Sequence, residues 1–139
     1  MLLKNFYRLQ ISDIICKDDQ YYSLVSDILS NKQVLSMKNF LQHGITSCYD
    51  HCLNVSYYSY LICKKFNLDA KSAARAGLLH DLFLYDWHDP DHYGKNTPLF
   101  KKHAFYHPYI ALKNANKLFK LNKIEKDIIA KHMWPLTIA

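Results

Sequence analysis

The sequence is short of turn-forming residues, with only three glycines and four prolines among its 139 residues. An all-β sandwich or barrel needs many tight turns, so this scarcity argues against that fold class. It also lacks an apolar run long enough to span a bilayer, and its N-terminus has no signal-peptide pattern. The hydrophobic fraction of 50% excludes a disordered chain. We therefore expect one folded, cytoplasmic protein with no membrane partner.

Disulfide bonding is not expected, because no two of the four cysteines have the C-x-x-C spacing. Cysteines of an intracellular chain are usually reduced thiols. Cys48 and Cys52 are four residues apart, and a zinc site that adds His51 is the alternative. On a helix, however, the His51 side chain would point about 100° away from Cys52. Half-buried thiols are the favoured interpretation.

Charge is distributed unevenly along the chain. The net charge is +6, with −1 carried by residues 1–94 and +7 by residues 95–139. Such a basic C-terminal third of the sequence could bind a nucleic acid or a phosphorylated substrate. A lysine-coated helical surface is the other explanation, and scattered lysines nearly free of arginine favour it. Nucleic acid is therefore not the expected partner.

The hydrophobic pattern has a helical period throughout and predicts an all-α, compact bundle of five to seven helices. The expected helices cover residues 18–30, 32–42, 46–66, 70–82, 108–119 and 122–134, with a polar loop at 83–98. The expected caps are Thr46 or Ser47 for the third helix, with Ser47 and Asp50 resembling a capping box, and Asp69 and Asn122 for the later ones, while Pro108 fits a first helical turn. Small residues of the fourth helix should allow close packing: Ala70, Ala73, Ala74 and Gly77. The third helix carries the stripe Cys48, Cys52, Val55, Ser59, Ile62 and Phe66.

Eight histidines are present, and their placement indicates a metal site. Taken alone, any one of them is more simply a hydrogen-bonded core residue. Together, four of them and one carboxylate come from four separate helices, on inward faces or at helix ends: His51, His80, Asp81, His107 and His132. Such a mixed nitrogen and oxygen set suits a divalent transition metal such as Fe, Mn, Zn, Ni or Co. Helical bundles build metal centres from ligands that converge in this way.

The motifs around these residues resemble the HD-domain superfamily of metal-dependent phosphohydrolases. The similarity runs from about Gln42 to the C-terminus and includes small stand-alone bacterial members. It is carried by the first-histidine block with the His-Asp pair, "HGITSCYDHCLNVSYYSYLICKKFNLDAKSAARAGLLHDLFLYDW", and by "KKHAFYHPYIAL" and "IIAKHMWPLT". The resemblance implies an HD-like fold, with residues 1–43 as a helical segment packed on a metal-binding core at 44–139.

The resemblance also implies a role for each site residue. His51, His80 and Asp81 match the ligands of a first metal, and His107 and His132 match those of a second. Asp81 would bridge the two ions and serve as a catalytic residue. His103, one helical turn before His107, is the other expected catalytic residue, as a phosphate contact or a support for the ligands.

Two departures from the family pattern matter for activity. The superfamily usually carries a final ligand Asp on a later helix, whereas no carboxylate follows His132 here. The His-Asp pair is followed by Leu82 and Phe83 instead of the Gly and Lys of HDIG-type signatures. A cyclic-dinucleotide phosphodiesterase is therefore not supported.

Three functions remain open at this point. The favoured one is a phosphomonoesterase or phosphodiesterase that uses one or two metal ions on a nucleotide or another small phosphate ester. The alternative is a catalytically incomplete HD fold that senses nucleotides or binds proteins. A nucleic-acid-binding helical protein is a distant third. A homo-oligomer stays open in each case.

Overall fold

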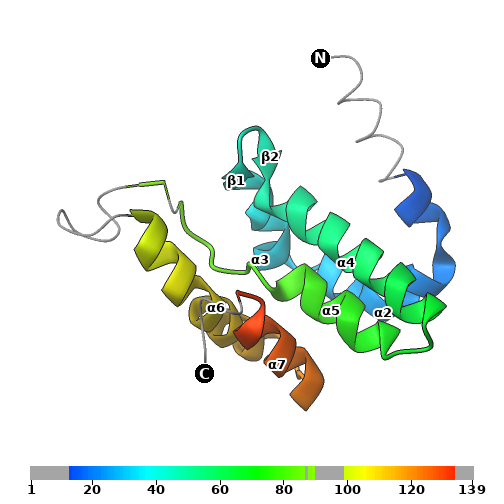
Figure 1. Cartoon of the computed structure of the whole chain (residues 1–139). Coiled ribbons are helices and arrows are strands. Elements are labelled where there is room, and N and C mark those ends of the chain that lie inside the picture. The colour runs from blue at the N-terminus through cyan, green and yellow to red at the C-terminus, as the bar shows by residue number, and fades with distance from the viewer. Residues whose placement is uncertain (1–12, 87, 90–98, 134–139) are drawn as a thin grey trace.

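The computed structural model describes residues 13–86, 88–89 and 99–133. Within these ranges the chain forms a helical segment at 13–17, six further α-helices, one 3-10 helix and a short antiparallel hairpin, which confirms the all-α prediction (Figure 1). No helix in the described part is both long and apolar enough to cross a membrane. The elements are α2 (Asp19–Leu29), α3 (Lys32–Leu35), η1 (Ser36–Asn39), β1 (Leu41–His43), β2 (Thr46–Ser47), α4 (Cys48–Lys65), α5 (Ala70–Leu79), α6 (Leu99–Leu118) and α7 (Lys123–Lys131).

Polar side chains fix where the helices begin. Ser47 accepts a hydrogen bond from the Asp50 amide at the start of α4, and Asp69 accepts one from the Ser72 amide at the start of α5. Asn122 and Glu125 form a complete capping box at α7. These bonds satisfy amides that a helix leaves without partners in its first turn. The three expected caps are confirmed.

Helices α4 and α5 lie side by side at the centre, with α2 on one side and α7 packed on α5 and α6 (Figure 1). Their close approach depends on Gly77. A Cβ atom at this position would lie 2.7 Å from the Ser56 Cα, which is too close for any real side chain. Gly77 therefore allows the close packing that the sequence predicted for this helix. Buried apolar side chains from α2, α4 and α5 form most of the core around this pair.

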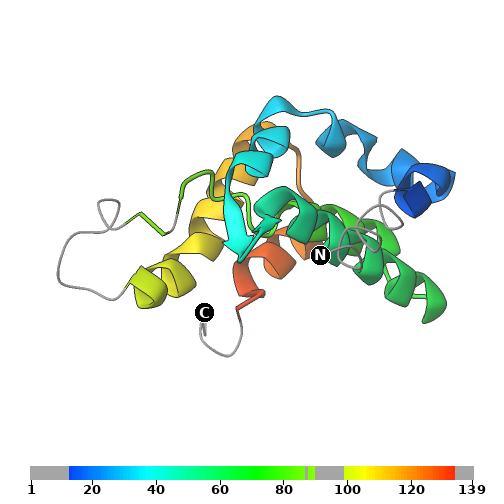
Figure 2. The same cartoon turned by 90° about the horizontal axis from the view of Figure 1, so that it is seen from above.

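The helix predicted at 32–42 is wrong in its second half. The α-helical part ends at Leu35, η1 continues to Asn39, and the chain then turns into the β1–β2 hairpin that leads into α4 (Figure 2). Gly44 forms the turn with a positive φ of 57°, which glycine adopts without strain. The Cys48 amide donates to the Phe40 carbonyl at 2.7 Å, so tertiary hydrogen bonds replace helical ones here.

The predicted stripe on the third helix mixes two faces. Cys48 and Cys52 are buried in the core, but Val55 and Ser59 are only half-buried, and Ile62 is 56% exposed. The buried face is instead formed by small and aromatic side chains, at steps of four residues plus the neighbouring Tyr57: Cys48, Cys52, Ser56, Tyr57 and Tyr60. Polar or phenolic side chains fill the core positions that apolar residues were expected to occupy. The apolar residues Val55 and Ile62 of the predicted stripe line a cavity next to the candidate metal centre.

Helix α6 begins nine residues earlier than predicted. Pro108 lies inside it and not in its first turn, so His107 is a mid-helix residue. The loop predicted at 83–98 lies partly outside the described residues, and so does the end of the helix predicted at 122–134. Helix α2 packs on α5, where the half-buried Arg75 side chain donates to both Asp27 carboxylate oxygens and to the Leu24 carbonyl. The proposed boundary between residues 43 and 44 stays a prediction.

Candidate metal centre

The five predicted ligands come together at one point. His51 lies in the first turns of α4, His80 and His132 are the C-caps of α5 and α7, and His107 lies within α6. Asp81 follows His80 and is at their centre, with an exposed fraction of 2%. Its Oδ2 atom lies 3.2 Å from His80 Nε2 and 3.4 Å from His51 Nε2. Its Oδ1 atom lies 3.2 Å from His107 Nε2 and 3.4 Å from His132 Nε2.

Backbone carbonyls fix the proton positions on three of these rings. His80 Nδ1 lies 2.7 Å from the Gly77 carbonyl, and His132 Nδ1 lies 2.7 Å from the Ile129 carbonyl. His107 Nδ1 lies 2.6 Å from a carbonyl one turn earlier, that of His103. A carbonyl only accepts, so each Nδ1 carries the proton and donates it. The last carbonyls of α5 and α7 lack helical partners, which is why a C-cap histidine is held there.

The fixed tautomers turn three Nε2 lone pairs toward the carboxylate. His107 Nε2 and His132 Nε2 lie only 2.7 Å apart, although neither carries a proton in the neutral ring. His51 Nε2 and His80 Nε2 lie 3.2 Å apart. Within the part of the chain that the structure describes, Asp81 Oδ1 is buried and has no hydrogen-bond donor, since the two nitrogens near it present lone pairs. Buried acceptors that face one another require a cation or added protons.

The geometry fits two cations that share Asp81. One group is His51, His80 and Asp81, and the other is Asp81, His107 and His132, with all ligand atoms of each group within 4.8 Å of one another. Ligand atoms about 2.1 Å from one ion are roughly 3 Å apart when they meet at right angles. The observed separations of 2.7 to 3.4 Å within these groups match that spacing. Each group supplies three protein ligands, which leaves positions for water or substrate.

Asp81 is a carboxylate when the rings around it are protonated or a cation is bound. Burial raises the pKa of Asp81, but the charge of His80 and hydrogen bonds from protonated His107, His132 and His51 outweigh it. They hold that pKa well below its usual range. A divalent cation would have the same effect without the protons. Gln42 supports the anion by donating from Nε2 to Asp81 Oδ2 at 2.9 Å.

His103 lies beside the ligands and supports one of them. Its ring stacks on His107 with centroids 4.4 Å apart, and its carbonyl orients His107. Burial, followed by the charge of His107, lowers the pKa of His103 to about 3. Its Nδ1 atom lies 3.1 Å from the Tyr85 hydroxyl. The ring is therefore neutral at physiological pH. Its predicted catalytic role stays a prediction.

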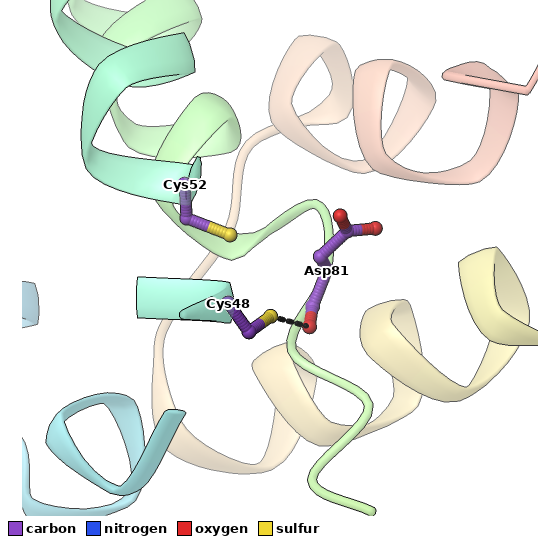
Figure 3. A group of neighbouring side chains, drawn as sticks. All are labelled: Cys48, Cys52 and Asp81. Atoms are coloured by element: carbon purple, nitrogen blue, oxygen red, sulfur yellow. Dashed lines mark hydrogen bonds between the residues drawn. The ribbon is translucent and has the colours of Figure 1, made fainter. Parts of the chain in front are cut away.

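A second group near Asp81 contains the thiols of Cys48 and Cys52. Figure 3 shows that the Asp81 carboxylate extends away from Cys48, whose thiol instead donates to the Asp81 backbone carbonyl at 3.4 Å. Burial, helped by Cys48, raises the pKa of the Cys52 thiol well above its usual range. Metals bind thiolates, so a protonated thiol makes this a poor metal site. His51 joins the histidine group and not the cysteines.

Sequence reasoning missed Gln42 and the three carbonyls that orient the rings. Gln42 is buried, and nothing in its local pattern sets it apart, because the hairpin that carries it was predicted as helix. The carbonyls that orient His80 and His132 could have been expected from the sequence. His80 and His132 each follow the last residue of a helix, where free carbonyls await donors.

The comparisons with known proteins agree with this geometry. A family model described as the HD domain matches residues 48–137, which include all five ligands. No curated protein and no solved structure matches the chain. Because the family match covers well over half of its length, the chain belongs to the HD-domain family, whose superfamily consists of metal-dependent phosphohydrolases.

Proposed function

We propose that the chain is a metal-dependent hydrolase of small phosphate esters. His51, His80 and Asp81 would hold one divalent transition-metal ion, and Asp81, His107 and His132 a second. The observation that carries this proposal is the 2.7 Å separation of His107 Nε2 and His132 Nε2, both deprotonated in the tautomers that the backbone imposes. A bundle that only needed a stable core would not bury facing acceptors.

Hydrolysis joins the oxygen of water to phosphorus, breaks the ester P–O bond and releases an alcohol that takes up a proton. Bound divalent ions supply a Lewis acid that polarises a phosphoryl oxygen and lowers the pKa of water. The chain's own residues orient the ligands and keep the site anionic. Asp81 is held as a carboxylate by its surroundings, so its role is to bind and bridge, and not to accept a proton.

His103 acts in this proposal as a positioning residue. It stacks on His107 and fixes that ring through its carbonyl. Because its ring is neutral at physiological pH, it adds no charge next to the cations. A neutral neighbour leaves the His107 lone pair available, whereas a protonated one would repel a divalent ion.

The test compares Asp81→Asn with Asp127→Asn, after metal removal and reloading with Mn²⁺ or Fe²⁺. Asp127 is an exposed carboxylate on α7 that pairs only with Lys131 in the described contacts, so it makes a matched control. Bound metal per chain and hydrolysis of a panel of phosphate esters are measured for both variants and wild type. Loss of Asp81 should lower turnover by at least about a thousandfold, the scale for removing part of a catalytic group that acts as a unit.

Two results would contradict this function. If wild type takes up no transition metal, the ligand assignment fails. If it binds metal but hydrolyses none of the esters, the hydrolase assignment fails, and the alternative of a non-catalytic module gains support. The Asp127→Asn control should match wild type in both measurements.

A further inference from the structure

A cavity of about 460 Å³ opens between α4, α5 and α7 directly beside the candidate metal centre. Its inner end is lined by His51, His80 and His132, which are ligands of both groups. The His51 side chain is 31% exposed, so the ligand group is reachable from this side. The volume is in the range of small-molecule sites. A molecule in this cavity would therefore contact the metal centre at one end.

The rest of the wall is apolar. Val55 and Ile62 of α4 and Ile128 of α7 supply branched aliphatic side chains. Ser59 and Ala73 are small, and their size leaves the space between the helices. Ile62 is 56% exposed even though it is one of the larger apolar side chains. Contact of a ligand with this wall would remove apolar surface from water, which is favourable.

Among the described residues, those that line the wall do not include the groups that a nucleotide needs. None of the ten lining residues in the described structure is Lys, Arg, Asp, Glu, Phe, Tyr or Trp. Further phosphates would find no cation, and a base would find no benzene or indole ring on which to stack. A base also carries several donors and acceptors, and burying these without partners is costly. The wall offers them only the Ser59 hydroxyl and the Cys63 thiol besides imidazoles.

We propose that this cavity binds the organic group of a phosphate monoester and selects an apolar, uncharged group over a nucleoside. This inference rests on the proposed hydrolase function, because it places the phosphate at the histidine end. The apolar group then lies along Val55, Ile62 and Ile128. The substrate class is thus an alkyl or cycloalkyl monophosphate, and the exposed wall of α4 is a specificity surface.

Binding is measured by calorimetry with methylphosphonate, hexylphosphonate and adenosine monophosphate, using Mn²⁺-loaded and metal-free protein. Hydrolysis of methyl phosphate, hexyl phosphate and adenosine monophosphate is followed in parallel. Hexylphosphonate should bind at least about tenfold more tightly than methylphosphonate, since each fully buried methylene contributes roughly fourfold. Adenosine monophosphate should not bind about tenfold more tightly than methylphosphonate. The preference for hexyl should persist without metal, although both phosphonates bind more weakly.

Variants of the wall test the location. Ala73→Leu fills the cavity and should remove the hexyl preference, whereas Lys71→Leu places the same side chain on the exposed face of α5 and should keep it. Ile62→Ser changes an exposed position, so the fold tolerates it, and should lower the preference about threefold through lost apolar contact. These variants remain informative even if Ala73→Leu fails to fold.

The outcomes separate this inference from the proposed function. Hexyl selectivity that Ala73→Leu or Ile62→Ser removes, without turnover of any ester, would keep the pocket and reject the hydrolase. Turnover that favours adenosine monophosphate, or that ignores both variants, would keep the hydrolase and overturn the pocket. A dimer in sedimentation that Ile62→Ser dissociates would also overturn it, because a second copy of the chain would then cover the wall.

Discussion

Two buried polar clusters lie within this small bundle, and they treat their hydrogen-bonding groups in opposite ways. Between α2, α4 and α5, Ser56 donates to the Ala74 carbonyl at 2.6 Å, so the Tyr21 hydroxyl donates to Ser56 Oγ at 2.8 Å. Both hydroxyl protons in this series of hydrogen bonds have an acceptor. At the other end of α4 and α5, three Nε2 lone pairs and a carboxylate face one another without protons between them.

This difference separates a cluster that stabilises the fold from one that is built to bind. A satisfied network in a low-dielectric interior rigidifies the helices that it joins. In the histidine cluster Gln42 donates to Asp81 Oδ2, but Oδ1 and the facing Nε2 lone pairs receive no proton in the described structure, which lowers the stability of the fold until a cation binds. Helices α4 and α5 contribute to both clusters. The hydrogen-bonded cluster around Ser56 therefore holds these two helices in the register that the cluster around Asp81 requires. Three predictions test this division, in order of decreasing effect.

The largest effect should come from metal. Adding Mn²⁺ to chelator-treated wild type, at about a thousand times the dissociation constant, should raise the free energy of unfolding by about 4 kcal/mol. Asp81→Asn should lose most of that gain. In chelator, however, Asp81→Asn should be at least as stable as wild type, because an amide NH₂ can donate to the Nε2 lone pairs.

Urea unfolding, with and without metal, measures both quantities. A metal-free Asp81→Asn protein that is more than about 2 kcal/mol less stable than wild type would show that Oδ1 of the Asp81 carboxylate already has hydrogen-bond donors. The two clusters would then not differ as described. Asp127→Asn serves as the matched change of charge on α7.

The second prediction concerns the close contact between α4 and α5 at Gly77, which positions both clusters. Gly77→Ala puts a Cβ atom 2.7 Å from Ser56 Cα and 3.0 Å from Ser56 N, so the two helices must separate. Overpacking of this kind costs about 1–3 kcal/mol, and the better helix propensity of alanine returns less than about 1 kcal/mol. We expect a net loss of about 1–2 kcal/mol in urea unfolding. Lys71→Ala, on the exposed side of α5, should stay within about 0.5 kcal/mol of wild type.

The sequence predicted which five residues converge at the candidate metal centre, and most helix starts, because these depend on local signals. Ser47, Asp69 and Asn122 precede helical patterns, and the His-Asp pair ends one of them. It did not predict the buried face of α4, since Ser56 and Tyr60 become core residues only through partners on other helices. Nor did it predict Gln42, whose position depends on a hairpin and on a carboxylate 39 residues away. The register between helices is a tertiary property that periodicity does not contain.

The smallest effect should come from the satisfied cluster itself. Tyr21→Phe removes one donor, while Ser56 keeps its bond to the Ala74 carbonyl, so the loss should be about 1 kcal/mol near neutral pH. Tyr22→Phe changes an exposed tyrosine of the same helix and should have little effect. A loss much above 3 kcal/mol would mean that the cluster is cooperative and cannot be treated as separate bonds.

The pH dependence of the same variant gives an independent check. Burial raises the pKa of Tyr21 from 10.0 to about 12, so the folded state favours the neutral phenol. Its contribution is fully present below about pH 10 and is lost as the pH rises toward 12, where the unfolded chain ionises first. The stability advantage of wild type over Tyr21→Phe should therefore shrink, and then reverse, across that interval. An advantage that stays constant up to pH 12 would show that the phenol is not held neutral, and that this cluster is less closed than its hydrogen bonds imply.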